Sequence, residues 1–180
     1  MAVESGDIKI RLSTQSATEG DDVASTPAES IGGFMSTTDL VDATLENLFP
    51  NISAAQAAAG VTLYRCVFVL NSNASDTWEE VKAWLVSQQA GGGTVAIGLD
   101  PAGAVAGDAN TAQAEAPADE ETAPDGVTFS NPTTIDSALD LVELEAGEAY
   151  AIWLRLTVPP DVEALNLDNA IMRVRGVSEP

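Results

Sequence analysis

The chain has 180 residues, 45% of them hydrophobic, and its 28 acidic and 7 basic side chains give a formal charge of -21. This length suits one domain with appended segments, and this charge makes nucleic acid and an anionic membrane surface unfavourable partners. No apolar run approaches the roughly 18–20 residues that span a bilayer, and residues 1–5 lack the cation that begins a secretory signal.

Residues 1–35 are predicted to form an extended N-terminal arm. A short segment near residue 10 alternates apolar and polar side chains, and the Ser-, Thr- and acid-rich tract after it has little to bury. We expect such an arm to become ordered on a partner, and its deletion over residues 1–33 to leave a folding domain. The expected partner-interface anchors of the arm are Ile8, Ile10, Leu12, Ile31 and Phe34.

Residues 36–60 are predicted to connect the arm to the folded body. Apolar residues at helical spacing predict a short helix over 39–48, which Pro50 ends. The β-branched residues in the same stretch favour an alternative, an extended segment with a turn at 49–51. An Ala-rich helical turn over 53–59, ended by Gly60, can follow.

The β-sandwich domain is expected from residue 61 to residue 180. Residues 63–71 predict a strand whose faces are both apolar except at Arg65, so we expect cover on both sides. Strands at 78–87 and 94–99 follow, with the glycines at 91–93 turning the chain between them. Because short turns join these three strands, we expect an antiparallel meander.

Residues 100–126 are predicted to form a long exposed loop, because Ala, Gly, Pro and acidic residues dominate the stretch. Its charged tip lies at 119–121. The later predicted elements are strands at 127–129, 139–144 and 170–176 and a polar turn at 166–169.

Residues 149–158 give the clearest strand of the chain. One face carries only apolar side chains, namely Tyr150, Ile152, Leu154, Leu156 and Val158. Burial of five such side chains contributes about 7–15 kcal/mol before chain entropy is counted, so this strand should be central. About seven short strands separated by turn signals predict an all-β, immunoglobulin-like antiparallel β-sandwich.

The residue types argue against catalysis. The chain has no histidine, which removes the commonest general base and the usual zinc and iron ligands. The glycines at 91–93 lack the Gly-Lys-Ser/Thr ending of a phosphate-binding loop. Cys66 is the only cysteine and lies in an apolar run, which predicts a buried thiol. We therefore expect a protein that is not an enzyme and has no cofactor.

Two binding alternatives stay open at this point. The acidic residues at 119–121 and Asp125 offer oxygen ligands for calcium. Their spacing does not match the roughly 12-residue calcium loop, so the alternative interpretation is a solvated acidic loop without a metal ion. Trp78, Trp84 and Trp153 could stack on sugar rings, or could line the core or a subunit interface. Trp78 and Trp84 are six residues apart and would share one face of a strand.

The five arginines all lie in predicted strands. In so acidic a chain each is expected to meet a carboxylate, within the domain or across an interface. They are Arg11, Arg65, Arg155, Arg173 and Arg175.

Several stretches resemble, in the same order along nearly the whole chain, a group of small virion proteins of tailed bacteriophages. These stretches are IKIRL at 8–12, IGG at 31–33, NLF at 47–49, AAAGVTLYRC at 57–66, APDGVTF at 123–129 and AIWLR at 151–155. They are structural motifs without catalytic residues. The acidic insert at 115–125 is more charged than the group leads us to expect.

The resemblance implies a structural role in a virion. It favours a capsid decoration or cement protein on the outer surface of the particle, which bridges neighbouring major capsid subunits through its arm. A tail, neck or baseplate component is the alternative, followed by a carbohydrate-binding module of a receptor-binding apparatus. The expected partners are other virion proteins and further copies of the chain, with Trp78 and Trp84 added to the arm residues as interface candidates.

Overall fold

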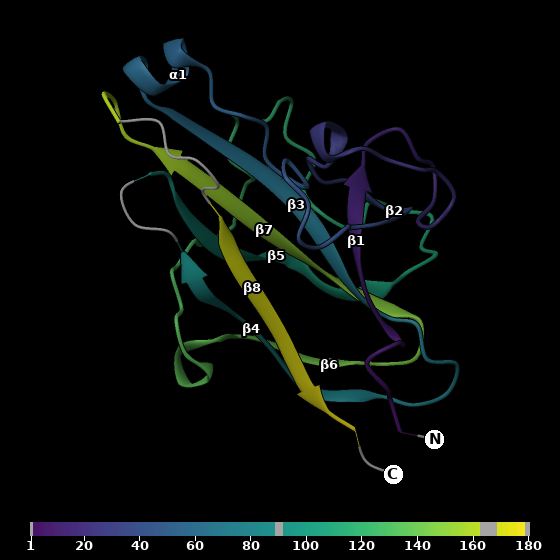
Figure 1. Ribbon diagram of the computed structural model, residues 1–180. Helices are drawn as coiled ribbons and strands as arrows, with labels where there is room; N and C mark the ends of the chain where they lie inside the picture. Colours follow the sequence, from purple (N-terminus) through teal and green to yellow (C-terminus); the bar gives the residue numbers. More distant parts are fainter. Residues whose placement is uncertain (1, 89–91, 163–168, 179–180) are drawn as a thin grey trace.

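Two antiparallel β-sheets packed face to face make up the protein, as seen in a computed structural model that describes residues 2–88, 92–162 and 169–178 (Figure 1). The first sheet has the strand order β2-β1-β3-β7-β5 and the second has the order β6-β4-β8. The predicted turns at 91–93 and 166–169 include residues 91 and 166–168, which lie outside the described residues.

The strands of the five-stranded sheet are β1 (Ile8–Thr14), β2 (Phe34–Asp39), β3 (Val61–Asn71), β5 (Thr94–Ala106) and β7 (Glu148–Val158). Those of the three-stranded sheet are β4 (Trp78–Gln88), β6 (Leu139–Leu144) and β8 (Ala170–Val177). The helical elements are α1 (Ala54–Ala59) and the short 3-10 turns η1 (Pro27–Glu29) and η2 (Ile135–Ser137). The predicted all-β sandwich is confirmed, as are the predicted strands at 63–71, 78–87, 94–99, 139–144, 149–158 and 170–176.

Strand β7 lies inside the five-stranded sheet, as its apolar face predicts, and pairs with β3 on one side and β5 on the other. Ile152 and Leu154 on that face enter the core between the two sheets. Val67 and Val69 of β3 and Val81 and Leu85 of β4 fill the same core. Removing this apolar surface from water is the main stabilising contribution to the sandwich.

The other face of the five-stranded sheet is also covered. Trp153, Phe68 and Cys66 on that face are fully buried and form a second core with Met35 and Ala114. Loop segments around residues 30–33 and 107–129 supply the cover, which explains why the strand at 63–71 has two apolar faces. The predicted buried thiol of Cys66 is confirmed.

The predicted meander is wrong. From β3 onward, the chain alternates between the two sheets, so β3, β4 and β5 are not neighbours in one sheet. Because β4 lies in the other sheet from both β3 and β5, neither β3 and β4 nor β4 and β5 form a hairpin. Each crossing places the apolar face of a strand against the opposite sheet, where it can be buried.

The prediction of a free arm over residues 1–35 is also wrong. Residues 8–14 form β1, which pairs with β2 and with β3 inside the five-stranded sheet. Leu12 is only 2% exposed. The three alternating apolar side chains of this segment bury themselves in the core of their own chain, so no partner is needed to order them.

Residues 40–50 form turns and not the predicted helix over 39–48. Ala43 and Glu46 have positive φ values of 55° and 57°, which a right-handed helix does not allow. Leu40, Leu48 and Phe49 still pack against the main core. The predicted helical turn at 53–59 is confirmed as α1, with Ser53 as a capping box and Gly60 at its C-terminal end.

The prediction of a long exposed loop over residues 100–126 is wrong. The first residues of this stretch continue β5 to Ala106, and the rest folds back over the sheet, where Gln113 and Ala114 are buried. The predicted strand at 127–129 does not form in the described residues. The residue after this segment, Ser130, makes an isolated antiparallel bridge with Ile97. The segment runs directly over Gly98, where a Cβ atom would lie 2.7 Å from Val127.

Candidate functional site

The predicted arm anchors are occupied within the chain. Ile8, Ile10 and Leu12 pack in or against the core between the sheets. Ile31 and Phe34 are half-buried on either side of Gly32 and Gly33, which have φ values of 90° and 88°. A Cβ atom on Gly32 would lie 1.8 Å from the carbonyl oxygen of Glu115. The glycine pair is therefore a packing contact with the 113–115 segment and not a flexible hinge.

The tryptophans do not form a sugar-binding platform. Trp78 and Trp84 are each 7% exposed, and Trp153 is fully buried. The two residues of β4 do not share a face as predicted, because the register shifts between Trp78 and Val81 at a bulge where Glu80 has a φ of 50°. Trp78 therefore points into the core, whereas Trp84 lies on the outer face of the three-stranded sheet.

The acidic insert is held firmly to the body. The buried Arg65 side chain, 1% exposed, pairs with the carboxylate of Glu120 and donates to the carbonyl oxygen of Leu48 at 3.1 Å. The backbone N–H of Tyr64 also donates to the carbonyl oxygen of Glu120 at 2.7 Å. The insert therefore continues the sheet edge beside β3 instead of extending into solvent.

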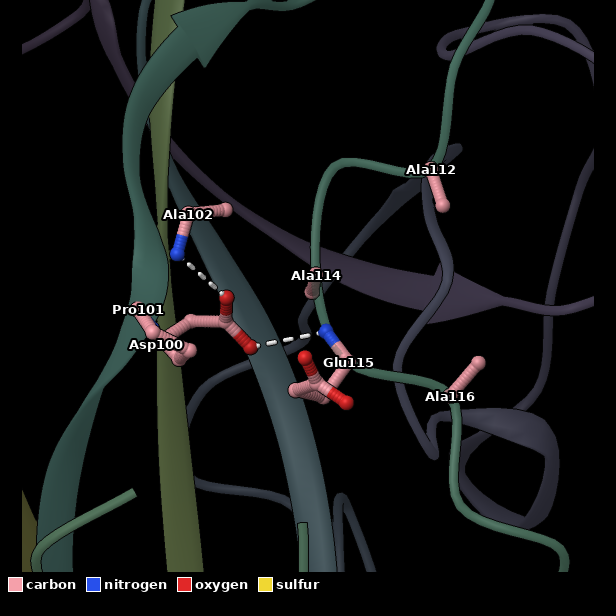
Figure 2. Close-up of a pocket in the computed structure, with 7 residues that line it drawn as sticks. All are labelled: Asp100, Pro101, Ala102, Ala112, Ala114, Glu115 and Ala116. Carbon is pink, nitrogen blue, oxygen red and sulfur yellow. Dashed lines mark hydrogen bonds between the residues drawn. The ribbon is translucent and has the colours of Figure 1, made fainter. Parts of the chain in front are cut away.

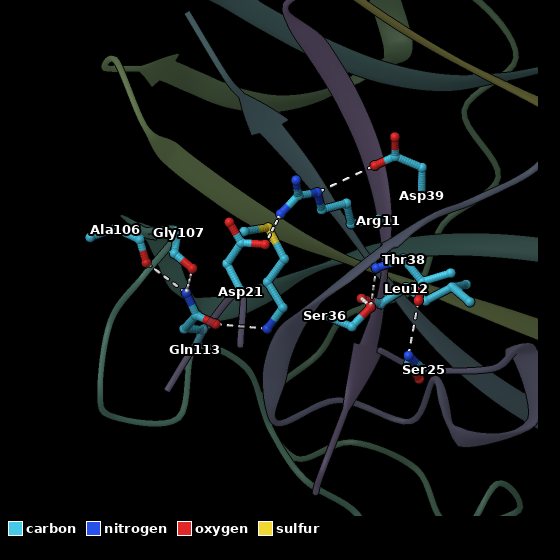
Figure 3. Close-up of polar contacts among 11 residues, drawn as sticks. Arg11, Leu12, Asp21, Ser25, Ser36, Thr38, Asp39, Ala106, Gly107 and Gln113 are labelled. Atoms are coloured by element: carbon cyan, nitrogen blue, oxygen red, sulfur yellow. Dashed lines mark hydrogen bonds and ion pairs between the residues drawn. The ribbon is translucent and has the colours of Figure 1, made fainter. Parts of the chain in front are cut away.

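Gln113 fixes the other half of the insert. Its Oε1 accepts a hydrogen bond from the Met35 N–H at 2.7 Å, and its Nε2 donates to the carbonyl oxygens of Ala106 and Gly107 at 2.6 and 3.0 Å (Figure 3). This buried amide thus joins β2, the end of β5 and the loop. Its hydrogen-bonding groups are used for structure.

An open depression of about 560 Å³ lies beside the buried Asp100, between the end of β5 and the segment 112–116. Both carboxylate oxygens are already engaged: Oδ1 accepts from the Ala102 N–H, and Oδ2 accepts from the Glu115 N–H, each at 2.9 Å (Figure 2). The indole of Trp153 donates to Oδ2 at 2.8 Å. This carboxylate therefore orders the loop and is not poised for proton transfer.

The described residues do not support the hypothesis of a calcium site in the acidic insert. Nowhere in the described ranges do three His, Cys, Asp or Glu side chains gather in positions suited to a metal ion. Asp119 caps its own turn by accepting from Thr122 and the Glu121 N–H. The hydrogen bond from the Thr122 side chain is the main cause that lowers the pKa of Asp119. Glu120 is engaged by Arg65.

Two of the five arginines meet a carboxylate within the described part of the chain. Arg11 pairs with Asp21 and with Asp39 (Figure 3). Arg65 pairs with Glu120. The guanidinium of Arg155 instead lies 4.9 Å from the ring centre of Phe129. That of Arg173 lies 5.9 Å from the ring of Trp84.

Three cations gather on the outer face of the three-stranded sheet. Arg173 and Arg175 are exposed there on β8, and Lys82 lies directly opposite Arg175 on β4. These three are among seven basic residues in the whole chain. None of them has a carboxylate within ion-pair distance in the described ranges. Asp140, the cross-strand neighbour of Lys82 on β6, accepts a hydrogen bond from Val142 N–H instead.

Apolar side chains surround these cations. Ile171 and Val177 on β8 are 52% and 43% exposed, and Val86 on β4 is 40% exposed. We call this surface the basic face; it comprises Lys82, Trp84, Val86, Ile171, Arg173, Arg175 and Val177. It combines cations without ion-pair partners in the described ranges and exposed aliphatic groups, with the buried ring of Trp84 beneath Arg173, and cations among exposed apolar groups are common on protein-binding surfaces. The sequence offered one signal for it, two arginines alternating in the last predicted strand.

Comparisons with known proteins give no assignment, since the chain matches no protein-family model, no curated protein and no solved structure. In the described part of the chain, no helix has the length and apolar character to cross a lipid bilayer.

Proposed function

We propose that this protein is a non-catalytic structural component of a tailed-bacteriophage virion, a capsid decoration protein that binds to neighbouring capsid subunits. The observation that carries the proposal is the basic face. A molecule with a formal charge of -21 presents three cations on one sheet face without carboxylate partners in the described ranges. Such a surface suits attachment to another protein, because charge complementarity steers docking and fixes its register.

The attachment site differs from the one that the arm prediction implied. The apolar side chains of residues 8–12 are already used in the core, so we assign the attachment to the basic face and not to residues 1–35. The strong negative charge elsewhere suits the outer surface of a particle, away from packaged DNA. The resemblance of the six sequence stretches to small virion proteins supports the virion context.

A tail, neck or baseplate component is the second candidate, because the same face could join copies of the chain into a ring. The two roles differ in copy number. A decoration protein covers the capsid lattice with on the order of hundreds of copies, whereas a ring contains a small multiple of three or six.

The test is quantitative mass spectrometry of purified phage particles from a host that carries the gene, with the major capsid protein as the internal standard. Copies in the hundreds support the decoration role. A small fixed multiple of three or six overturns it in favour of a ring. Absence of the protein from particles that package DNA normally overturns the virion proposal as a whole.

A further inference from the structure

Strand β8 has one edge that no other strand pairs with in the described part of the chain. It is the outermost strand of the order β6-β4-β8, and its pairing partner is β4 (Figure 1). Its side chains alternate regularly: Met172 and Val174 pack against the core, while Arg173 and Arg175 are exposed. Such an edge presents a row of backbone N–H and C=O groups that can pair with a further strand.

The other sheet edges are covered or distorted. At β2, the Thr37 N–H donates to the carbonyl oxygen of Val23 at 2.8 Å, so a loop covers this edge. At β5, Ile97 pairs with Ser130. At β6, Val142 has a φ of 63°, which breaks the regular extended backbone. These devices block strand addition at three of the four edges.

Among the described residues, strand β8 shows none of these devices. It contains no proline and no residue with positive φ, and its residues from Ala170 to Arg175 advance one at a time along the pairing. The extra residues of the two register shifts lie on β4, between Glu79 and Lys82 and between Leu85 and Ser87. The pairing of β8 is therefore regular from Ala170 to Arg175, the part that carries both arginines.

The charges on β8 decide what can pair with it. If β8 of a second copy paired with it in antiparallel fashion in the register centred on Val174, Arg173 of each copy would face Arg175 of the other, and like charges across a strand pair are destabilising. Lys82 and Arg175 already lie opposite one another within the chain. A neighbouring strand with carboxylates would lie beside Arg173 and Arg175 and could form bidentate pairs with both arginines.

We propose that β8 binds an extended, carboxylate-bearing segment of a partner protein, which adds as a further strand at its free edge. The carboxylates occur at every second position of that segment, because Arg173 and Arg175 are two residues apart on one face. This inference rests on the proposed attachment role and supplies its mechanism. It commits to a partner other than a second copy of the chain paired through β8.

The test uses the full-length protein and a fluorescent decapeptide in which Glu and Val alternate, with binding followed by fluorescence anisotropy. The matched control is a decapeptide of the same composition in which all the glutamates precede the valines. We expect the alternating peptide to bind at least about tenfold more tightly, because only its carboxylates share one face of a strand. Equal binding of the two peptides would show simple charge attraction and overturn the proposal.

Two variants of equal charge locate the binding site. Arg175→Glu and Lys9→Glu each change the net charge by the same amount, but Lys9 lies on β1, away from the basic face. We expect Arg175→Glu to weaken peptide binding at least about tenfold and Lys9→Glu to leave it within about twofold. Arg175→Lys, which keeps the charge without the planar fork, should fall between them. Equal losses from Arg175→Glu and Lys9→Glu would contradict the site, provided both variants unfold cooperatively like the parent.

Hydrogen exchange tests the mode of binding. Saturation with the alternating peptide should slow deuterium uptake at backbone amides of Ala170–Val177, because half of them would gain a hydrogen-bond partner. Unchanged uptake there would exclude strand addition even if the peptide binds. These measurements use the isolated protein, so they test strand addition separately from the virion role. Failure of the peptide to bind would overturn strand addition even if particles contain the protein. Absence of the protein from particles would overturn the virion role even if the peptide binds.

Discussion

The indole Nε1 of Trp153 on β7 donates a 2.8 Å hydrogen bond to the Asp100 carboxylate on β5. The same carboxylate holds the N–H groups of Ala102 and Glu115, so a single buried side chain connects two strands to the loop layer above them. A hydrogen-bonded buried carboxylate of this kind stabilises the fold through three charge-assisted bonds, each formed out of contact with water.

Asp100→Ala should therefore destabilise the protein strongly. The substitution leaves three donors without their acceptor, and we expect a loss of about 3 kcal/mol or more in the free energy of unfolding. Asp100→Asn keeps one acceptor oxygen and the side-chain volume, so it should lose roughly half as much. Urea unfolding followed by tryptophan fluorescence measures both. A larger loss for Asp100→Asn than for Asp100→Ala would contradict the accepting role of the carboxylate.

The pair formed by Arg65 and Glu120 should show strong coupling. Arg65 is buried, whereas the Glu120 side chain is 36% exposed. Glu120→Gln should cost about 1–3 kcal/mol because it leaves a buried cation without its anion. In the background of Arg65→Met, the same Glu120→Gln change should cost almost nothing, because the carboxylate no longer has a cation to neutralise.

The exposed pairs of Arg11 provide the control for this cycle. Arg11→Gln breaks contacts to Asp21 and Asp39, whose side chains are 43% and 54% exposed. It should cost less than about 1 kcal/mol and lose its effect in 1 M NaCl, whereas the Glu120 effect should persist there. Additive effects of Arg65→Met and Glu120→Gln would show that the two side chains do not act as a pair.

The strands of this protein could be predicted from sequence because their patterning is local. Tyr150, Ile152 and Leu154 recur at every second position, and this pattern predicts a strand with one apolar face whatever its neighbours are. The assignment of strands to sheets could not be predicted in the same way. A short turn such as 72–77 is compatible with a hairpin and with a crossing between sheets, and only packing of the whole core decides between them.

The candidate site was harder to predict than the fold. The bulge at Glu80 reverses the direction of Trp78 relative to Trp84, and bulges leave no reliable trace in residue patterning. The alternation of Arg173 and Arg175 was visible, but their lack of carboxylate partners depends on three-dimensional distances. The sequence pattern instead predicted Ile8 and Ile10 as interface residues. Apolar and polar side chains alternate in the same way in a strand buried in its own sheet and in an arm buried on a partner.

Deleting residues 1–33 should unfold the protein. The deletion removes β1 from between β2 and β3 and takes Leu12 out of the core. Leu12→Ala, a milder test, should cost about 2–5 kcal/mol, while Lys9→Ala on the same strand should change stability by less than about 0.5 kcal/mol. Circular dichroism and urea unfolding measure these effects. A truncated protein that unfolds cooperatively with the midpoint of the full chain would restore the arm interpretation.

Stability should fall at alkaline pH. Burial raises the pKa of the Cys66 thiol well above its usual range, and the charge of Asp100 adds to the effect. Below about pH 8 the thiol is mostly protonated in both states, so it gives little pH dependence. Above that pH the unfolded chain loses the proton while the folded chain keeps it, and the free energy of unfolding therefore decreases. Burial also raises the pKa of Tyr150, which extends the decline above about pH 10.

The variant Cys66→Ala tests this origin. Its stability at neutral pH should be lower because the side chain loses volume in the second core, but its decline between about pH 8 and 10 should be shallower. Tyr150→Phe should leave that interval unchanged and flatten the curve only at higher pH. The measurement is the urea midpoint across the pH series in the presence of a reducing agent. The same slope in the parent and in Cys66→Ala would exclude the thiol as the cause.

Val142→Gly should stabilise the protein, which is unusual for a valine in a strand. Val142 is 63% exposed and has a φ of 63°, a conformation that costs a β-branched residue about 1–2 kcal/mol. Glycine adopts this conformation without strain, although its larger entropy in the unfolded chain offsets part of the gain, so we expect a net increase of roughly 0.5–1 kcal/mol. Val177→Gly, at an exposed valine of β8 without a positive φ, should instead lose about 0.5–1 kcal/mol. Urea midpoints of the two variants should therefore shift in opposite directions, and a parallel decrease would show that the backbone at Val142 is not strained.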